Sequence, residues 1–175
     1  MKSKAFIVLG MHRSTTSLIA KALHLAGVNM GAKGERKQYG TDYGFYEDLD
    51  FINMNDTLLR EAGGSWKDLP THEAIIEAGC ARKQGIARLI NKKKKGLWGW
   101  KDPRTILTLE CYLPFLEDVH LLTVFRDRRE VAKSMYKRDR NDREISMEKA
   151  LELADEYNKR LLRLLRKNKD ISWLA

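Results

Sequence analysis

The chain has 175 residues, 43% of them hydrophobic and 33% charged, with a formal net charge of +9. This length suits one domain with a substantial core and is short for two, so we expect a single domain over residues 1–175. The composition is typical of a globular protein and excludes fibrous and disordered classes. The positive charge favours an anionic partner, and two cysteines without a C-x-x-C pair argue against a disulfide framework and against zinc.

The N-terminal stretch "MKSKAFIVLGMHR" begins like a secretory signal. Its apolar part is shorter than the roughly 7–15 residues of a signal core. No apolar stretch approaches the roughly 20 residues of a membrane span. We therefore predict a soluble, cytoplasmic protein that has no membrane partner.

Hydrophobic periodicity predicts the elements of the first half of the chain. The continuous apolar run 5–9 predicts a strand buried on both faces, and the helical spacing that follows predicts a helix over 16–26. Residues 31–46 are rich in glycine and polar side chains and predict a long loop, of the kind that is often functional. Helices are predicted over 47–62 and over 72–91.

Lysines 92–95 close the last of these helices. Lysines suit a helix C-terminus and a solvated face, which we prefer over a dedicated anion site. The same criteria predict the remaining elements: strands over 97–100, 119–125 and 171–175, and helices over 127–140 and 146–167.

Strands separated by helices indicate parallel pairing with helices on both faces. We therefore predict an α/β fold, a three-layer sandwich around a central parallel sheet. In such folds ligands bind at the carboxyl ends of the strands. Here those ends follow Leu9, Trp100 and Phe125.

The first strand end carries "GMHRSTTS", residues 10–17. Gly10 permits a tight turn, and Arg13 supplies a fixed positive charge. Hydroxyl side chains and free backbone N–H groups then meet at a helix N-terminus, which favours an anion; the hydroxyl residues are Ser14, Thr15, Thr16 and Ser17. In the common nucleotide loop G-x-x-x-x-G-K-[ST], Thr15 would be glycine and Thr16 lysine. The alternative is that the hydroxyls only cap the helix.

The other two strand ends are also basic. "KDPRT" at 101–105 brings Lys101 to the same edge, although such a cluster can be a solvated turn. Arg126 ends the third strand, and Ser134 lies eight residues later in the next helix. A ligand with separated anionic groups would suit these three ends, and the missing loop lysine argues against magnesium triphosphate.

These motifs resemble the sulfotransferases that use 3′-phosphoadenylyl sulfate. Their phosphosulfate loop commonly reads like G-x-x-[RK]-S-G-T-[ST], which "GMHRSTTS" resembles, except that Thr15 stands at the glycine. Their 3′-phosphate element has an arginine at a strand end and a serine eight residues later, as in "VFRDRREVAKS". "WGWKDPRT" and "GFYEDLDFINMNDTLL" are also similar to segments of some members.

The resemblance implies a P-loop-like phosphosulfate-binding loop and a sulfuryl transfer without a metal, which leaves 3′-phosphoadenosine 5′-phosphate as product. Binding residues for the donor would be Gly10, Arg13, Ser14, Thr15, Thr16, Ser17, Arg126 and Ser134. Arg13 would stabilise the leaving oxygen, with help from Lys101.

A hydroxyl acceptor also needs a general base. Glu47 is the first choice, although it could simply favour a helix N-terminus. His12 is the second, although it could be a packing residue. Asp102 is the third, although a structural pairing with Arg104 suits it better. The aromatic partner of adenine is open, with Trp66, Trp98 and Trp100 as candidates.

The acceptor would be a small molecule or a glycan, with a hydroxyl or an amine as the group that is sulfated. Three other functions compete with this one. An inactive relative would bind nucleotide without transfer. A nucleic-acid-binding module would bind any polynucleotide in a salt-sensitive way, but no stacking platform is evident and we expect no nucleic-acid partner. A small-molecule kinase would bind ATP with magnesium and would need the lysine of the nucleotide loop, where this chain has Thr16. The oligomeric state cannot be derived from the sequence.

Overall fold

The computed structural model describes residues 3–31, 46–139, 145–168 and 172–174, with backbone alone for 138, 139 and 172–174. Most of the predicted loop 31–46 therefore lies outside the described residues. In chain order the elements are β1 (Lys4–Gly10), α1 (Thr16–Leu25), α2 (Leu49–Glu61), α3 (His72–Ala81), α4 (Lys83–Lys93), β2 (Leu97–Lys101), α5 (Thr105–Tyr112), the 3-10 turn η1 (Leu113–Phe115), β3 (Val119–Val124), α6 (Arg128–Asp139), α7 (Met147–Lys167) and β4 (Ser172–Leu174).

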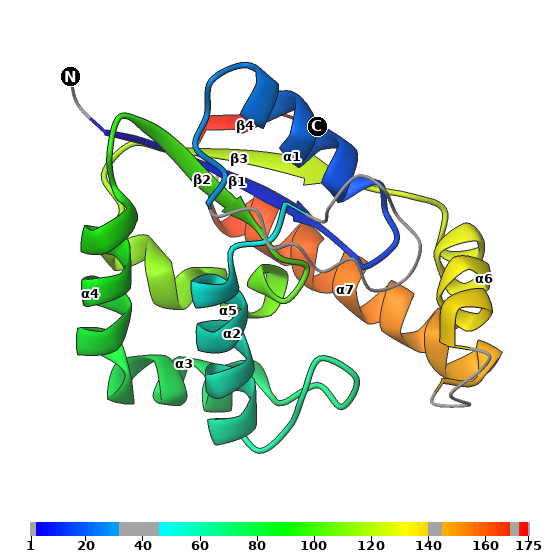
Figure 1. Cartoon of the computed structure of the whole chain (residues 1–175). Helices are drawn as coiled ribbons and strands as arrows, with labels where there is room; N and C mark the ends of the chain where they lie inside the picture. The colour runs from blue at the N-terminus through cyan, green and yellow to red at the C-terminus, as the bar shows by residue number, and fades with distance from the viewer. Residues whose placement is uncertain (1–2, 32–45, 140–144, 169–171, 175) are drawn as a thin grey trace.

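The strands form one parallel sheet in the order β2-β1-β3-β4, which confirms the α/β class (Figure 1). The first strand is central, and its register pairs Lys4 with Leu97 and Ala5 with Val119. The carboxyl ends of β1, β2 and β3 are therefore neighbours at one edge of the sheet.

Helices cover both faces of the sheet. In Figure 1, α1 lies on one face, and α5 and α7 lie on the other, with α2, α3 and α4 on that same side. Side chains of β1 alternate between two cores: Ile7 and Leu9 pack with the larger helical layer, whereas Val8 packs with Ala20 of α1. Burial on both faces explains the unbroken apolar run of this strand.

Aromatic side chains fill the core between the sheet and α2. The ring of Phe51 stacks on that of Trp100, with centroids 4.1 Å apart and planes 4° apart. Trp98 and Tyr112 complete the cluster. Since Trp98 is 3% and Trp100 0% exposed, neither ring is available to stack on adenine, and these two candidates were wrong.

Two helices differ from the prediction. The single helix expected over 72–91 is broken at Arg82, whose backbone angles (φ −97°, ψ 8°) end α3 and precede α4. Arg82 instead forms an ion pair with Glu61 at the end of α2. Helix α5 was not predicted, because nearly all its residues are buried and it has no polar face to reveal a helical period.

Candidate functional site

The loop between β1 and α1 makes a tight turn at the end of the central strand. Gly10 is required there, since a Cβ atom would lie 2.5 Å from the Thr16 methyl group and 3.0 Å from the Val124 carbonyl oxygen. The Ser14 amide donates to the Met11 carbonyl at 3.1 Å, and α1 begins at Thr16. Thr15 is the N-cap and its side chain makes no capping hydrogen bond. The amides of the first turn point toward the N-terminal end of α1, as in any α-helix.

Backbone strain gathers at this edge of the sheet. Three non-glycine residues among those described have positive φ: Arg13 (66°), Thr15 (69°) and Tyr46 (49°). Thr15 therefore adopts the left-handed conformation that a glycine would adopt freely, and it keeps the cost of a Cβ atom. Such outliers persist where surrounding structure enforces them, and they cluster at functional sites.

Side chains from the first and third strand ends meet directly. Arg13 Nε donates to Ser134 Oγ at 2.9 Å, which joins the loop to α6. Arg126 Nη1 donates to the carbonyl oxygen of Arg13 at 2.8 Å. Arg13, Arg126 and Ser134, which the sequence places far apart, therefore form one basic cluster.

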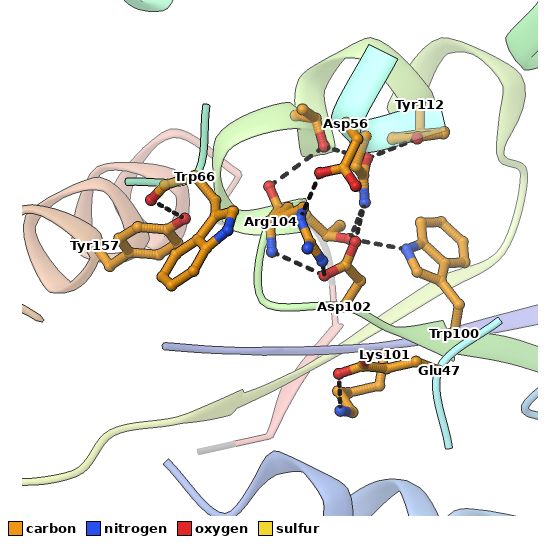
Figure 2. Close-up of polar contacts among 12 residues, drawn as sticks. Glu47, Asp56, Trp66, Trp100, Lys101, Asp102, Arg104, Tyr112 and Tyr157 are labelled. Atoms are coloured by element: carbon orange, nitrogen blue, oxygen red, sulfur yellow. Dashed lines mark hydrogen bonds and ion pairs between the residues drawn. The ribbon is translucent and has the colours of Figure 1, made fainter. Parts of the chain in front are cut away.

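The second strand end contributes an ion pair between a buried lysine and a half-buried glutamate. Lys101 is 2% exposed, and its Nζ lies 2.5 Å from Oε1 of Glu47, the residue that precedes the N-cap of α2. In Figure 2 this pair lies on the opposite side of the strand from Trp100 and Asp102, as the alternation of a strand requires. Lys101 and Glu47 were both predicted as site residues, and the structure joins them.

A polar cluster anchors the other side of the β2 end. Asp102 Oδ1 accepts from Arg104 Nη1 at 3.0 Å, and Arg104 Nε pairs with Asp56 Oδ1 at 2.7 Å (Figure 2). Burial opposes the charge of Arg104, but Asp102 and Asp56 raise its pKa above the ordinary value. Burial raises the pKa of Asp56, and Arg104 opposes that effect. Asp102 is therefore a structural partner of Arg104.

Asn55 of α2 holds this cluster together and was not predicted. Its amide nitrogen donates to Asp102 Oδ2 at 2.8 Å, and its oxygen accepts from Thr108 and Tyr112, each at 2.7 Å. Asn55 is fully buried. On the predicted helix over 47–62, Asn55 lies on the same face as the apolar residues Ile52 and Leu59. A polar side chain on a buried face needs hydrogen-bond partners, and this signal could have identified Asn55 as part of a polar cluster.

The remaining predicted residues have different environments. His12 packs its ring on Trp66, with centroids 4.5 Å apart, and stands edge-on to Tyr157 at 6.2 Å. Lys67 Nζ lies 5.1 Å from the centre of the Trp66 ring. In the loop, Ser14 and Thr16 are buried, Ser17 is half-buried and Thr15 is exposed.

Comparison with known proteins does not assign the chain to a family. No protein-family model matches the chain, and no curated protein gives a significant match. Within the described ranges, no group of three or more His, Cys, Asp or Glu side chains is arranged to hold a metal ion. None of the helices described combines the length and the apolar run that a membrane crossing needs.

Proposed function

We propose that this protein is a sulfotransferase that moves a sulfuryl group from 3′-phosphoadenylyl sulfate to a hydroxyl or amine of a small molecule or glycan. The observation that carries the proposal is the basic cluster of Arg13, Arg126 and Ser134 at adjacent ends of β1 and β3. It combines two arginines, a hydroxyl and a helix N-terminus, a donor set that suits a ligand with two anionic groups.

The residues present fit such a donor. Arg126 and Ser134 would hold the 3′-phosphate, and Arg13 with the first-turn amides of α1 would hold the phosphosulfate. The lack of a Cβ atom at Gly10 keeps the turn close to β3. The proposal includes the finer fold assignment, a three-layer sandwich with a P-loop-like loop between β1 and α1.

Glu47 is the proposed general base. Its carboxylate accepts the proton of the acceptor hydroxyl while the acceptor oxygen forms a bond to sulfur and the bond from sulfur to the bridging phosphate oxygen breaks. Arg13 stabilises the charge that develops on the leaving phosphate. Lys101, at 2.5 Å, keeps Glu47 oriented. We prefer Glu47 to His12 because the His12 ring packs on Trp66 and Tyr157.

Calorimetric titration with 3′-phosphoadenosine 5′-phosphate, without magnesium, tests the proposal. We expect micromolar binding to the wild type and a loss of at least about 30-fold in Arg126→Ala, since a charged hydrogen bond contributes about 2 kcal/mol or more. Arg129→Ala is the matched control, because this arginine is also exposed and lies in the first turn of α6. Equal binding by the two variants would contradict the assignment of the cluster.

The same titration, together with a transfer assay and a polynucleotide titration, separates the first two competing functions from the proposal. Nucleotide binding without sulfuryl transfer to any acceptor would identify an inactive relative. Absence of binding at millimolar nucleotide, together with salt-sensitive binding to any polynucleotide, would replace the proposal with a nucleic-acid-binding function.

A further inference from the structure

The four lysines 92–95 differ in their contacts. Lys93 Nζ lies 2.5 Å from Asp48 Oδ2 and 2.8 Å from Asp50 Oδ2, and its side chain is 19% exposed. Lys92 reaches Asp50 at 2.9 Å but is 68% exposed. Lys94 and Lys95 are exposed. The expectation of a solvated run therefore fails at Lys93, which bridges two carboxylates at the start of α2.

Asp48 links that bridge to the helix. Its Oδ1 accepts from the Asp50 amide at 2.9 Å as the N-cap, while its Oδ2 meets Lys93. The side chain is 2% exposed, and a Cβ atom on Gly31 would lie 2.4 Å from Oδ2. With both oxygens engaged and the space around it filled, Asp48 has one orientation.

Glu47 is the next residue along the backbone. It precedes this fixed N-cap and follows Tyr46, which has a φ of 49°. Its carboxylate meets Lys101 at the end of β2, while Lys93 ends α4, the element just before β2. The α4–β2 unit therefore supplies one lysine to Glu47 and another to the residue that anchors its backbone.

We propose that Lys93 is a positioning residue for Glu47: it fixes Asp48 and so keeps the Glu47 carboxylate at Lys101. The proposal deepens the proposed sulfotransferase function and rests on it for the role of Glu47. Lys93 thereby differs in role from the other lysines of the run 92–95, which are exposed at the end of a helix.

The contact of Lys93 with Asp48 and Asp50 is called the clamp below. Hydrogen exchange tests whether the clamp holds the start of α2, and it requires no enzymatic activity. In Lys93→Met we expect the amides of Asp50 to Ile52 to exchange about tenfold faster than in the wild type, the size of a lost N-cap interaction. Lys94→Met, one residue further and exposed, is the matched control and should leave these amides unchanged. Equal exchange in the two variants would overturn the proposal, whatever the chain does with nucleotide.

Turnover of the donor tests the positioning. The probe is hydrolysis of 3′-phosphoadenylyl sulfate: the oxygen of water forms a bond to sulfur, Glu47 takes the proton, and the bond from sulfur to the bridging phosphate oxygen breaks. The products are sulfate and 3′-phosphoadenosine 5′-phosphate. We expect Lys93→Met to lower turnover roughly 10- to 100-fold, as a small misplacement of a reacting group does. Affinity for 3′-phosphoadenosine 5′-phosphate should stay within about twofold. Lys93→Arg, which can bridge both carboxylates, should restore most of the rate.

The outcomes separate the two proposals. If Lys93→Met loosens α2 but turns over the donor as fast as Lys94→Met, the positioning role is wrong. If the wild type binds no nucleotide, the sulfotransferase function is wrong, and the role of Lys93 toward a catalytic Glu47 is overturned with it, although the exchange data still report whether the clamp exists.

Discussion

Single side chains hold the candidate site by satisfying buried polar groups. Asn55 uses both ends of its amide, and its partners are Asp102 in the turn after β2 and Thr108 and Tyr112 in α5. A buried polar group that loses its partner retains its full desolvation cost. The stability of this region therefore depends on one amide more than on any exposed ion pair.

Asn55→Ala should lower the free energy of unfolding by about 3–5 kcal/mol, because four buried side chains lose a partner: Asp102, Thr105, Thr108 and Tyr112. Urea unfolding measures the change. Asn53→Ala, an exposed asparagine in the same helix, is the control and should change stability by less than about 0.5 kcal/mol. A loss as small as that of the control would show that water replaces the amide.

The left-handed backbone of Thr15 predicts a stabilising substitution. Thr15→Gly should raise the free energy of unfolding by about 1 kcal/mol, since glycine adopts a φ of 69° without the Cβ penalty. Thr15→Ala keeps the Cβ atom and should bring no gain. Thermal or urea unfolding of the two variants decides the question, and equal stabilities would mean that the loop relaxes around threonine.

At the scale of elements, the sequence predicts those helices and strands whose hydrophobic residues recur with a clear period. The runs that form β1 and β3 and the amphipathic α7 were correctly placed. Helix α5 was missed because it is buried on nearly all sides. The break at Arg82 was missed because no glycine or proline stands at residue 82 itself, while the two nearby glycines, Gly79 and Gly85, lie inside α3 and α4. The three basic strand ends were expected at one edge, but the contacts Arg13–Ser134 and Lys101–Glu47 depend on tertiary distances that spacing does not encode.

The approach of β1, α1 and β3 at Gly10 predicts a coupled pair of substitutions. Gly10→Ala should destabilise the fold by about 1–3 kcal/mol, because its methyl group would overlap the Thr16 methyl. Adding Thr16→Ser removes that methyl and should recover part of the loss. A double-mutant cycle in urea measures the coupling, and strict additivity would show that the contact with the Val124 carbonyl dominates.

At the scale of the whole molecule, the interior responds to alkaline pH. Burial raises the pKa of Cys111 from its ordinary value of 9.0 to about 11, and burial also raises the pKa of Tyr112 and of Tyr157. The unfolded chain loses these protons first. The stability that these protonated side chains contribute is therefore fully present below about pH 9 and decreases as the pH rises toward 11.

Unfolding in urea between pH 8 and pH 11 checks this dependence. For a pKa shift of this size, Cys111 contributes at most about 3 kcal/mol to the loss of unfolding free energy at high pH. Cys111→Ala should therefore show a shallower loss of stability with pH, although it starts lower because of the cavity. Cys80→Ala is the control, since that thiol is exposed and its removal should leave the slope unchanged. Parallel curves for all three proteins would assign the alkaline response to the tyrosines.

The central position of β1 also has a consequence for the order of events during synthesis. This strand leaves the ribosome before both of its neighbours, Leu97–Lys101 and Val119–Val124, which are made much later. Helix α1 can cover one of its faces early, but the backbone of "AFIVL" has no strand partner in the sheet until β2 has been made, and its second partner, β3, is complete only at Val124. The nascent chain therefore carries this apolar segment without a strand partner while residues 11–96 are made, and binding by a chaperone in that interval would protect it from aggregation.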